Sequence, residues 1–397
     1  MKNLSLNLYL EINNQNFAFY VEESDEQKTS KIIYETKIPL QGIDNNRIFD
    51  QEKTYSTIKE KIYFIEQKYK FTFKEIILIL DYFNLSFTNI TGFKKLNGSQ
   101  ILRENVTYIL NTLKSYVSET ETTKTVLHIF NSRFELDNKK IENLPIGLFG
   151  DFYSHELSFV LMNTNDYKNL TTIFEKCNLR IKKIFIKSFI TGANISSEFR
   201  NNETFFVVKI NENNSKILFF ENNSLKFEQS FNFGTNILIK DISKVTALNL
   251  ETVKIILDKI KLSPDISEDE TIDKIFFKNE NYRKIKKKLI YEVVLARVKE
   301  MHEIILYKNV NFKHYIKAPK VVFLEIDNKT HLNNFDKIFE QVFSLEFYSK
   351  TNFVNITNNI LINTANKLVH FGWNKEAIPV TQSKKSLINR FFDAVFG

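Results

Sequence analysis

Apolar and polar residues follow regular patterns along the first ninety residues, and these patterns predict strands and one helix. Alternating side chains predict two strands, Leu6–Ile12 and Phe17–Glu22, joined by a hairpin turn at 13–15. A helix is indicated by apolar residues three or four positions apart, namely Tyr55, Ile58, Ile62, Ile65 and Tyr69. The apolar run Glu75–Leu80 is typical of a strand buried on both faces. This part of the chain is therefore predicted to form a hairpin-led sheet with a helix.

The same plan begins again near residue 200, after a separate β/α segment. That segment is predicted to contain a helix near 165–178 and the strands Val126–Phe130, Leu157–Met162 and Leu179–Ile186. The second copy opens with the strands Phe205–Ile210, Lys216–Phe220 and Leu225–Phe231. Helical stripes follow, with apolar residues at Val253, Ile256, Leu257, Ile260 and then at Ile290, Val294, Met301, Ile305, before a last strand, Val321–Ile326. Two such copies predict an α/β class with the bilobed plan of the actin superfamily.

Composition narrows the chemistry that this chain can perform. A length of 397 residues is too great for one compact core, which agrees with two or more domains. Only nine glycines are present, which are too few to favour Gly-rich phosphate-binding loops. The single cysteine, Cys177, excludes an intramolecular disulfide, and the six histidines lack metal-ligand spacing, so no metal site is expected.

Charge and hydropathy bear on partners and on location. The net charge of +8 suits an anionic partner, although a lysine-rich solvated surface gives the same number. Nucleic acid is not expected, because no recognition motif accompanies the basic residues. No run of about 18 uncharged apolar residues exists, and the first residues lack the apolar core of a signal peptide. The chain is therefore expected to stay in the cytosol.

Several segments resemble the FtsA family of bacterial cell-division proteins, in the family's order and spacing. Leu10–Ile12 resembles the first nucleotide-hairpin strand of that family, and Gly42–Asp44 resembles its Gly-Met/Ile-Asp turn. The clearest segment, Val126–Gly150, resembles part of the inserted subdomain called 1C. Asn363–Gly372 resembles the family's closing segment.

The resemblance implies how an actin-like fold would divide this chain. The implied parts are a lobe I core at 1–90 with 183–200 returning to it, subdomain 1C at 91–182, a lobe II core at 201–245 and 289–376, subdomain 2B at 246–288, a linker at 377–383 and a membrane-targeting amphipathic helix at 384–397.

The resemblance also implies a nucleotide cleft, but this sequence departs from the family there. The family's second hairpin carries two Asp and three Gly, whereas here Lys209 and Lys216 replace the acids and side chains replace every glycine. The first hairpin likewise lacks Gly after its acidic residue. The degenerate cleft is predicted to contain Glu11, Asn13, Lys209, Asn211, Gly234, Glu292 and Arg297.

These departures predict that ATP is not hydrolysed, and no cofactor is assigned. Side chains at the glycine positions would fill the space of the phosphates. Lys209 would place a cation where Mg²⁺ belongs, paired with Glu11 across the cleft. Residual binding of ATP and Mg²⁺, with Lys209 or Lys216 on phosphate, stays open. For Glu292 and Arg297 the alternative to an adenosine-side role is ion pairing that includes Glu300.

The last fourteen residues carry an amphipathic pattern. Their apolar residues fall on one helical stripe, namely Leu387, Ile388, Phe391, Phe392, Val395 and Phe396. Positive charge comes from Lys384, Lys385 and Arg390. A helix of about 20 Å is too short to cross a bilayer but can lie in its interface. The alternatives are docking on its own domain or pairing into a dimer.

The remaining basic cluster and the resemblance together indicate the partners. Arg283, Lys284 and Lys287 lie where the family's lobe II binds the C-terminal tail of FtsZ, although a solvated helix face is the alternative. The resemblance implies an adaptor that joins FtsZ, other divisome proteins, further copies of itself and membrane lipid at the cytoplasmic face of the cell membrane, at the septum. The alternatives are an ATP-binding, polymerising FtsA or a PilM-like pilus-assembly protein.

Overall fold

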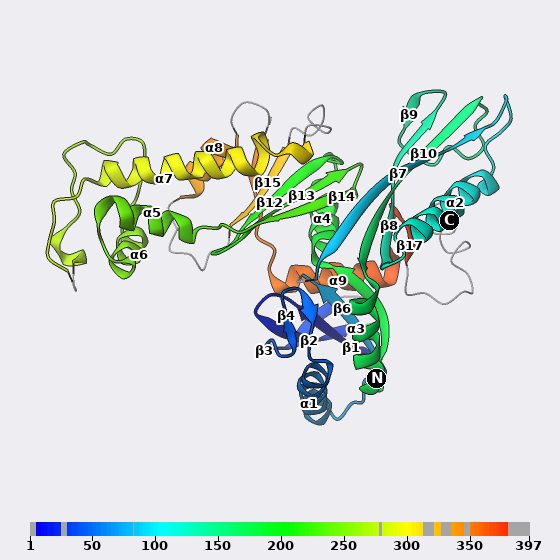
Figure 1. Cartoon of the computed structure of the whole chain (residues 1–397), viewed down its shortest axis with the longest axis horizontal. Coiled ribbons are helices and arrows are strands. Elements are labelled where there is room, and N and C mark those ends of the chain that lie inside the picture. Colours follow the sequence, from blue (N-terminus) through cyan, green and yellow to red (C-terminus); the bar gives the residue numbers. More distant parts are fainter. Residues whose placement is uncertain are drawn as a thin grey trace. The chain divides into compact units, whose positions relative to one another are not determined.

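The computed structural model describes residues 5–24, 30–81, 83–277, 280–312, 321–326, 335–344 and 350–379. These residues form two compact units, each described by itself (Figure 1). The first unit takes the described residues of Met1–Glu203, Phe220–Phe227 and Ile356–Gly397. The second takes those of Thr204–Phe219 and Glu228–Asn355.

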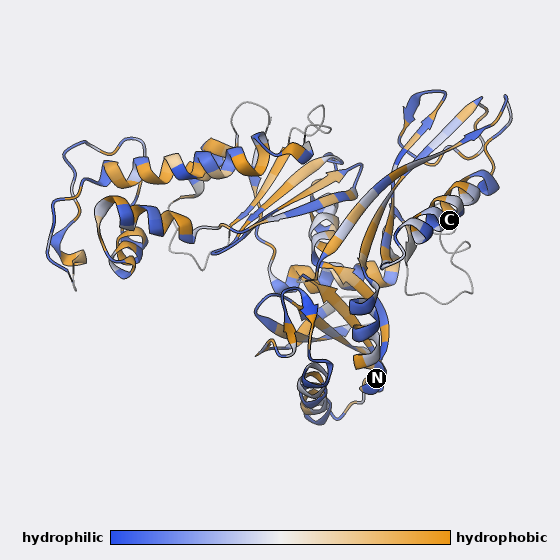
Figure 2. Ribbon diagram, in the orientation of Figure 1, coloured by the Kyte–Doolittle hydropathy of each residue, from blue (hydrophilic) through white to orange (hydrophobic). Residues whose placement is uncertain are grey.

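The first unit is built on a five-stranded sheet. Its central strand β1 (Ser5–Ile12) runs antiparallel to β2 (Asn16–Ser24) and parallel to β6 (Glu75–Leu80). Outside these lie β3 (Ser30–Pro39), next to β2, and β11 (Arg180–Ile186), parallel to β6. Consecutive residues of β1, β2 and β6 are buried, so both faces of the sheet are covered at its centre. The apolar residues of these strands are visible in Figure 2. Since β1, β6 and β11 are parallel, their carboxyl ends meet at one edge of the sheet.

Four helices accompany this sheet. They are α1 (Gln51–Tyr69), α3 (Thr164–Lys176), α4 (Lys187–Glu198) and α9 (Asn358–Phe371). The Asp50 side chain accepts from the Lys53 amide and caps the start of α1. Helix α1 packs on α3, and α9 packs on both α4 and β3. The short strands β4 (Ile43–Asp44) and β5 (Arg47–Ile48) pair with each other ahead of α1.

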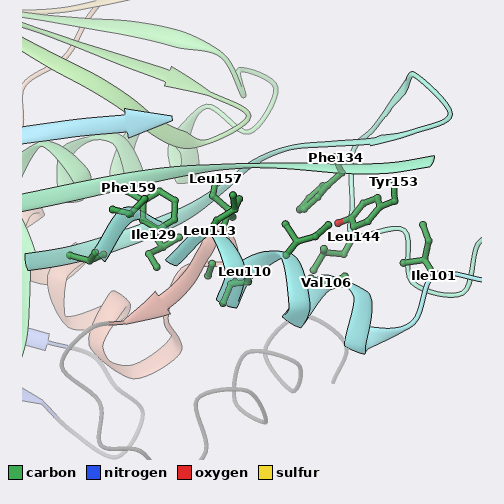
Figure 3. Packing of buried hydrophobic residues seen from close by; sticks show 14 of the residues in the cluster. Ile101, Val106, Leu110, Leu113, Ile129, Phe134, Leu144, Tyr153, Leu157 and Phe159 are labelled. Atoms are coloured by element: carbon green, nitrogen blue, oxygen red, sulfur yellow. The ribbon is translucent and has the colours of Figure 1, made fainter. Parts of the chain in front are cut away.

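A second sheet in the first unit has the strand order β17-β8-β10-β7, and β9 pairs with β8. The members are β7 (Leu85–Lys95), β8 (Lys124–Leu136), β9 (Lys139–Ile141), β10 (Phe152–Asn163) and β17 (Glu376–Pro379). Helix α2 (Arg103–Thr120) packs on this sheet. Figure 3 shows Val106, Leu110 and Leu113 of α2 directed at strand residues that include Leu157 and Phe159, and all five are buried.

The second unit repeats the strand order of the first sheet. Its order is β14-β13-β12-β15-β16. The strands are β12 (Phe205–Ile210), β13 (Ser215–Glu221), β14 (Ser224–Phe231), β15 (Val321–Ile326) and β16 (Lys350–Phe353). In both sheets the third, second, first, fourth and fifth strands in chain order are neighbours, and the last three of that series are parallel. This repetition gives the fold its duplicated, two-lobed plan.

The helices of the second unit follow its hairpin. They are α5 (Asn236–Thr246), α6 (Leu250–Lys259), η1 (Lys274–Phe276), α7 (Lys287–His302), the π-helix η2 (Glu303–Tyr307), η3 (Val310–Phe312) and α8 (Asp336–Phe343). Helix α5 packs on α6 and α7, and α7 packs on α8. No helix in the described residues is long and apolar enough to cross a membrane.

Three of the predicted divisions of the chain differ from the structure. Residues 356–376 were expected in lobe II but group with the first unit, because α9 packs on α4 and β3 and the Asn366 amide donates to Glu22. The expected linker at 377–383 begins inside strand β17, which pairs with β8. The tip of the β13–β14 hairpin, Phe220–Phe227, also belongs to the first unit, although 201–245 was assigned to lobe II.

Candidate functional site

The carboxyl edge of the first sheet holds a lysine between two carboxylates. Glu11 lies near the end of β1 and is buried, with 3% of its surface exposed. Lys187, the first residue of α4, places its Nζ 2.7 Å from Glu11 Oε1 and 3.3 Å from Asp81 Oδ2. The Tyr20 hydroxyl donates to Glu11 Oε2 at 3.1 Å. Burial, and then the charge of Glu11, raise the pKa of Tyr20, so this hydroxyl stays protonated as a donor.

Sequence patterns missed Lys187 and Asp81 as members of this site. Each directly follows the end of an apolar strand, Lys187 after β11 and Asp81 after β6. Because both strands are parallel to β1, the residues after their carboxyl ends are brought beside Glu11. The signal was therefore present as the first polar residue after each strand, but the strand order was needed to use it.

The first hairpin turn satisfies its own backbone donors. The amides of Gln15 and Asn16 donate to the Asn13 side-chain oxygen at 3.0 and 2.9 Å. The Asn13 amide donates to the Asn16 carbonyl at 3.2 Å. A phosphate-binding turn offers its N–H groups to the ligand. Here two of these N–H groups donate instead to the side chain of Asn13, a predicted site residue.

The second hairpin turn is likewise closed on itself. The Asn211 amide donates to the Asn214 carbonyl at 2.9 Å, and Asn211 Nδ2 donates to Asn214 Oδ1 at 2.6 Å. The Thr235 amide donates to the Asn211 carbonyl at 2.9 Å. A Cβ on Gly234 would lie 2.1 Å from that same carbonyl oxygen. Gly234 therefore allows the turn before α5 to pack directly on the hairpin turn.

The two lysines of the second hairpin have carboxylate partners in their own unit. Lys209 Nζ lies 3.1 Å from Oε1 of Glu325, its partner in the parallel β12–β15 ladder. Lys216 lies 3.4 Å from Glu228. Within the first unit Glu11 pairs with Lys187, and within the second Lys209 pairs with Glu325. The pairing of Lys209 with Glu11 stays a prediction from the sequence.

Of the two predicted site residues on α7, Arg297 forms ion pairs on the helix surface. Arg297 contacts both Asp241 of α5 and Glu300, one turn further along α7. The hydrogen bond to Asp241 is the main cause of a raised pKa for Arg297. Glu292 is exposed. This arrangement matches the ion-pair alternative for Arg297 and Glu300.

The basic cluster ahead of α7 is partly neutralised. Lys287 lies 3.0 Å from Glu270, and Arg283 lies 3.9 Å from Glu280. Neighbouring Lys288 lies 2.6 Å from Glu268. Lys284 is exposed. The cluster is therefore a mixed surface with alternating signs, more than a uniform positive face.

The predicted membrane-binding residues lie outside the described residues. They are Lys384, Lys385, Leu387, Ile388, Arg390, Phe391, Phe392, Val395 and Phe396. Their role remains the prediction made from the sequence.

The residues at the two hairpins do not fit a nucleotide bound with Mg²⁺. Hydrated Mg²⁺ is held through carboxylate oxygens, but the Lys187 ammonium already occupies the space between Glu11 and Asp81. The backbone donors of both turns bind within the turns, and the space beside Gly234 is occupied by the Asn211 backbone carbonyl. No group of three or more His, Cys, Asp or Glu in the described part of the chain is arranged to hold a metal ion.

Comparison with known proteins agrees with the duplicated topology. No protein-family model matches the sequence. A chain of the PilM–PilN type IV pilus biogenesis complex superposes with a TM-score of 0.53 at 9% identity, over 92% of this chain and 96% of that chain. The protein therefore has the actin-like ATPase fold.

Sequence comparison then gives the nearer likeness. Cell division protein FtsA of Buchnera aphidicola subsp. Schizaphis graminum (strain Sg) is 23% identical over 309 residues, which are 77% of this chain and 73% of that protein. FtsA of Buchnera aphidicola subsp. Baizongia pistaciae (strain Bp) is 23% identical over 264 residues, covering 66% and 62%. The chain is a divergent FtsA-like protein with the actin-like fold.

Proposed function

We propose that this chain is a cell-division adaptor that tethers FtsZ polymers to the cytoplasmic membrane without hydrolysing ATP. The likeness to proteins named FtsA supports the cell-division role. The fold likeness to PilM does not compete with it, because 9% identity carries the fold alone. The observation that carries the non-catalytic part is the Lys187 ammonium between Glu11 and Asp81.

This ammonium is covalently part of the chain and does not diffuse away as a free ion can. It compensates one of the two carboxylate charges at a partly buried position, where an unpaired charge is costly. A second cation in the same space would be repelled by Lys187, and removal of the lysine would cost its two ion pairs. The edge of the sheet thus carries its own cation, which suits a body that acts as a fixed scaffold.

Membrane attachment is proposed to come from residues 384–397. The apolar stripe contains three phenylalanines that can enter the acyl boundary while the three basic residues face anionic headgroups. Each basic residue adds about 1 kcal/mol near an anionic surface. One such helix binds weakly, so self-association of the actin-like bodies would supply firm attachment through several helices.

The partner surface is proposed to include the basic cluster of the second unit. Lys284 is exposed, while Lys287 and Lys288 are balanced by Glu270 and Glu268. A mixed surface of this kind selects an acidic and hydrophobic peptide such as the C-terminal tail of FtsZ, since its acids can compete for the lysines. The adaptor would then act at the cytoplasmic face of the membrane, at the septum, with other divisome proteins.

The test is co-sedimentation of FtsZ with anionic vesicles in the presence of the full chain. The chain is expected to bring FtsZ into the vesicle pellet, and Phe391→Glu with Phe392→Glu is expected to abolish this recruitment. Phe64→Ser is the matched control, because Phe64 is 53% exposed on α1 and outside the tail. Recruitment that survives the double substitution, or recruitment lost equally in the control, would overturn the tether.

A further inference from the structure

The segment that follows α9 lies against the second sheet of the first unit. We call residues 372–379 the strap. It begins at Gly372, whose φ of +72° ends α9 and whose Cβ position has no neighbour within 4 Å. Such an open left-handed glycine can change its backbone angles at little cost. The start of the strap therefore has the properties of a hinge.

Beyond the hinge, the strap makes a short β-pairing at the edge of the sheet. Strand β17 lies beside β8 (Figure 1). In the described part of the chain it pairs with three residues of β8, and Glu376 lies opposite Phe130. The Asn131 amide donates to the Lys375 carbonyl at 2.7 Å, and the Trp373 indole donates to the Asn223 carbonyl at 3.2 Å. The Ala377 side chain is 3% exposed within the α2 core. Lys375 Nζ also donates to the Glu142 carbonyl at 3.4 Å, and the Trp373 ring packs edge-on against Phe189. A strand of four residues has little stability of its own, so its docking depends on such side-chain contacts.

A buried ion-pair cluster is the charged part of this attachment. Glu376 Oε1 lies 2.7 Å from His128 Nδ1 on β8, and Oε2 lies 3.0 Å from Lys183 Nζ on β11. The side chains of His128, Glu376 and Lys183 are 0%, 4% and 8% exposed. Burial would raise the pKa of Glu376, but Lys183 and His128 lower it to about 2. Glu376 is therefore ionised when the strap is docked.

This cluster makes docking of the strap close to all-or-none. With Glu376 in place, the charges of Glu376 and Lys183 are compensated. When Glu376 leaves, Lys183 remains as a nearly buried, uncompensated ammonium, which is strongly unfavourable. Burial lowers the pKa of His128, so the imidazole does not readily become a second cation there. A single carboxylate thus decides whether the strap lies on β8.

We propose that residues 372–379 form a releasable strap, latched by Glu376, that sets the length of the tether between the actin-like body and the C-terminal segment. Release at Gly372 would free seven further residues, which extend the reach by up to about 23 Å at ~3.3 Å per residue. The docked strap gives a short tether and the released strap a long one. What the tether attaches to rests on the proposed function, but the latch itself does not.

Hydrogen exchange of the full chain, followed by mass spectrometry without vesicles or FtsZ, tests the latch. Glu376→Gln is expected to speed exchange across 372–379 and at the Asn131 amide by about 100-fold, while exchange in β10 is unchanged. Glu135→Gln is the matched control, since Glu135 is a β8 carboxylate paired with the exposed Arg133. It is expected to leave the strap protected.

A second variant separates release of the strap from general unfolding. Lys183→Met combined with Glu376→Gln removes both charges of the buried Lys183–Glu376 pair. The double variant is expected to restore protection to most of its original level. Unchanged exchange in Glu376→Gln, or faster exchange that spreads equally into β10 in both variants, would overturn the strap. Since no lipid or FtsZ is present, neither outcome depends on the tether function, which the vesicle assay tests separately.

Discussion

The ammonium of Lys187 lies 2.7 Å from the carboxylate of Glu11, at the edge of the sheet where β1, β6 and β11 end. Asp81 completes the arrangement at 3.3 Å. In an actin-like fold this edge would have to present free carboxylates to a metal ion, and here the chain supplies the cation itself. The stability of the first unit is therefore linked to a residue at the candidate site.

Lys187→Met is expected to destabilise the first unit by about 3 kcal/mol, because Glu11 is buried and would lose its cation. Millimolar Mg²⁺ is expected to restore part of the melting temperature in this variant and to change the wild type little, since only the variant has carboxylates to bind it. Thermal melting with and without Mg²⁺ measures both effects. Lys182→Met is the control, because Lys182 pairs with the more exposed Glu75. Equal responses to Mg²⁺ in all three proteins would contradict the assignment of Lys187.

The hairpin tip that belongs to the first unit depends on a fully buried lysine. Lys226 is 0% exposed and lies 2.6 Å from Glu156 and 3.4 Å from Glu221. Lys226→Met is expected to cost about 3 kcal/mol, since two acids lose their shared partner. Trp373 is the single tryptophan of the chain, and its indole donates to the Asn223 carbonyl in the same tip. Loosening of the tip in Lys226→Met should expose the indole to water and shift its emission to longer wavelength.

Urea unfolding followed by this fluorescence measures both effects of Lys226→Met. Lys139→Met, on the exposed strand β9, is the control and is expected to leave emission and stability unchanged. Emission that is identical in Lys226→Met and in the wild type would mean that the tip is held by other contacts.

Buried His155 is expected to make stability fall on acidification. Its Nε2 contacts Asn131 Oδ1 at 2.9 Å, and burial lowers its pKa from 6.5 to about 3. Between these values the unfolded chain binds a proton that the folded chain does not, so stability declines as pH falls below about 6.5, by up to ~1.4 kcal/mol per pH unit. Glu376, whose folded pKa is about 2, adds to the loss only below its ordinary value of 4.5.

The variant His155→Gln retains an amide donor but cannot titrate. Urea unfolding at pH 7 and at pH 5 is expected to show a smaller difference in this variant than in the wild type. His128, whose pKa burial also lowers, remains in both proteins and contributes equally to both. The assignment fails if the two proteins lose the same free energy of unfolding between these pH values.

Local patterns were sufficient wherever a strand is buried on both faces. Glu75–Leu80 and Val321–Ile326 were predicted with the bounds that the structure has, because each contains a run of at least four apolar residues in a parallel ladder. The helix predicted near 165–178 lies at Thr164–Lys176. It could be predicted because the spacing of its apolar residues is a local feature of the sequence.

Contacts between distant residues could not be predicted in this way. Glu11 and Lys187 are 176 residues apart, and His128 and Glu376 are 248 apart. Which polar residues meet depends on strand order, which periodicity does not contain. The destination of α9 and β17 was missed for the same reason, because both pack on elements formed from the first half of the chain. Gly234 was identified as a turn glycine, but its close neighbour, the Asn211 carbonyl, was not foreseen.

The central proposal is that ATP is not hydrolysed because the cleft does not bind it together with Mg²⁺. It is tested most directly by calorimetric titration of the full chain with ATP in the presence of Mg²⁺. No Mg²⁺-dependent heat of binding is expected at micromolar concentrations, since the Lys187 ammonium lies between Glu11 and Asp81 and both hairpin turns bind their own donors. Micromolar binding of ATP that requires Mg²⁺ and is lost in Glu11→Gln would contradict it.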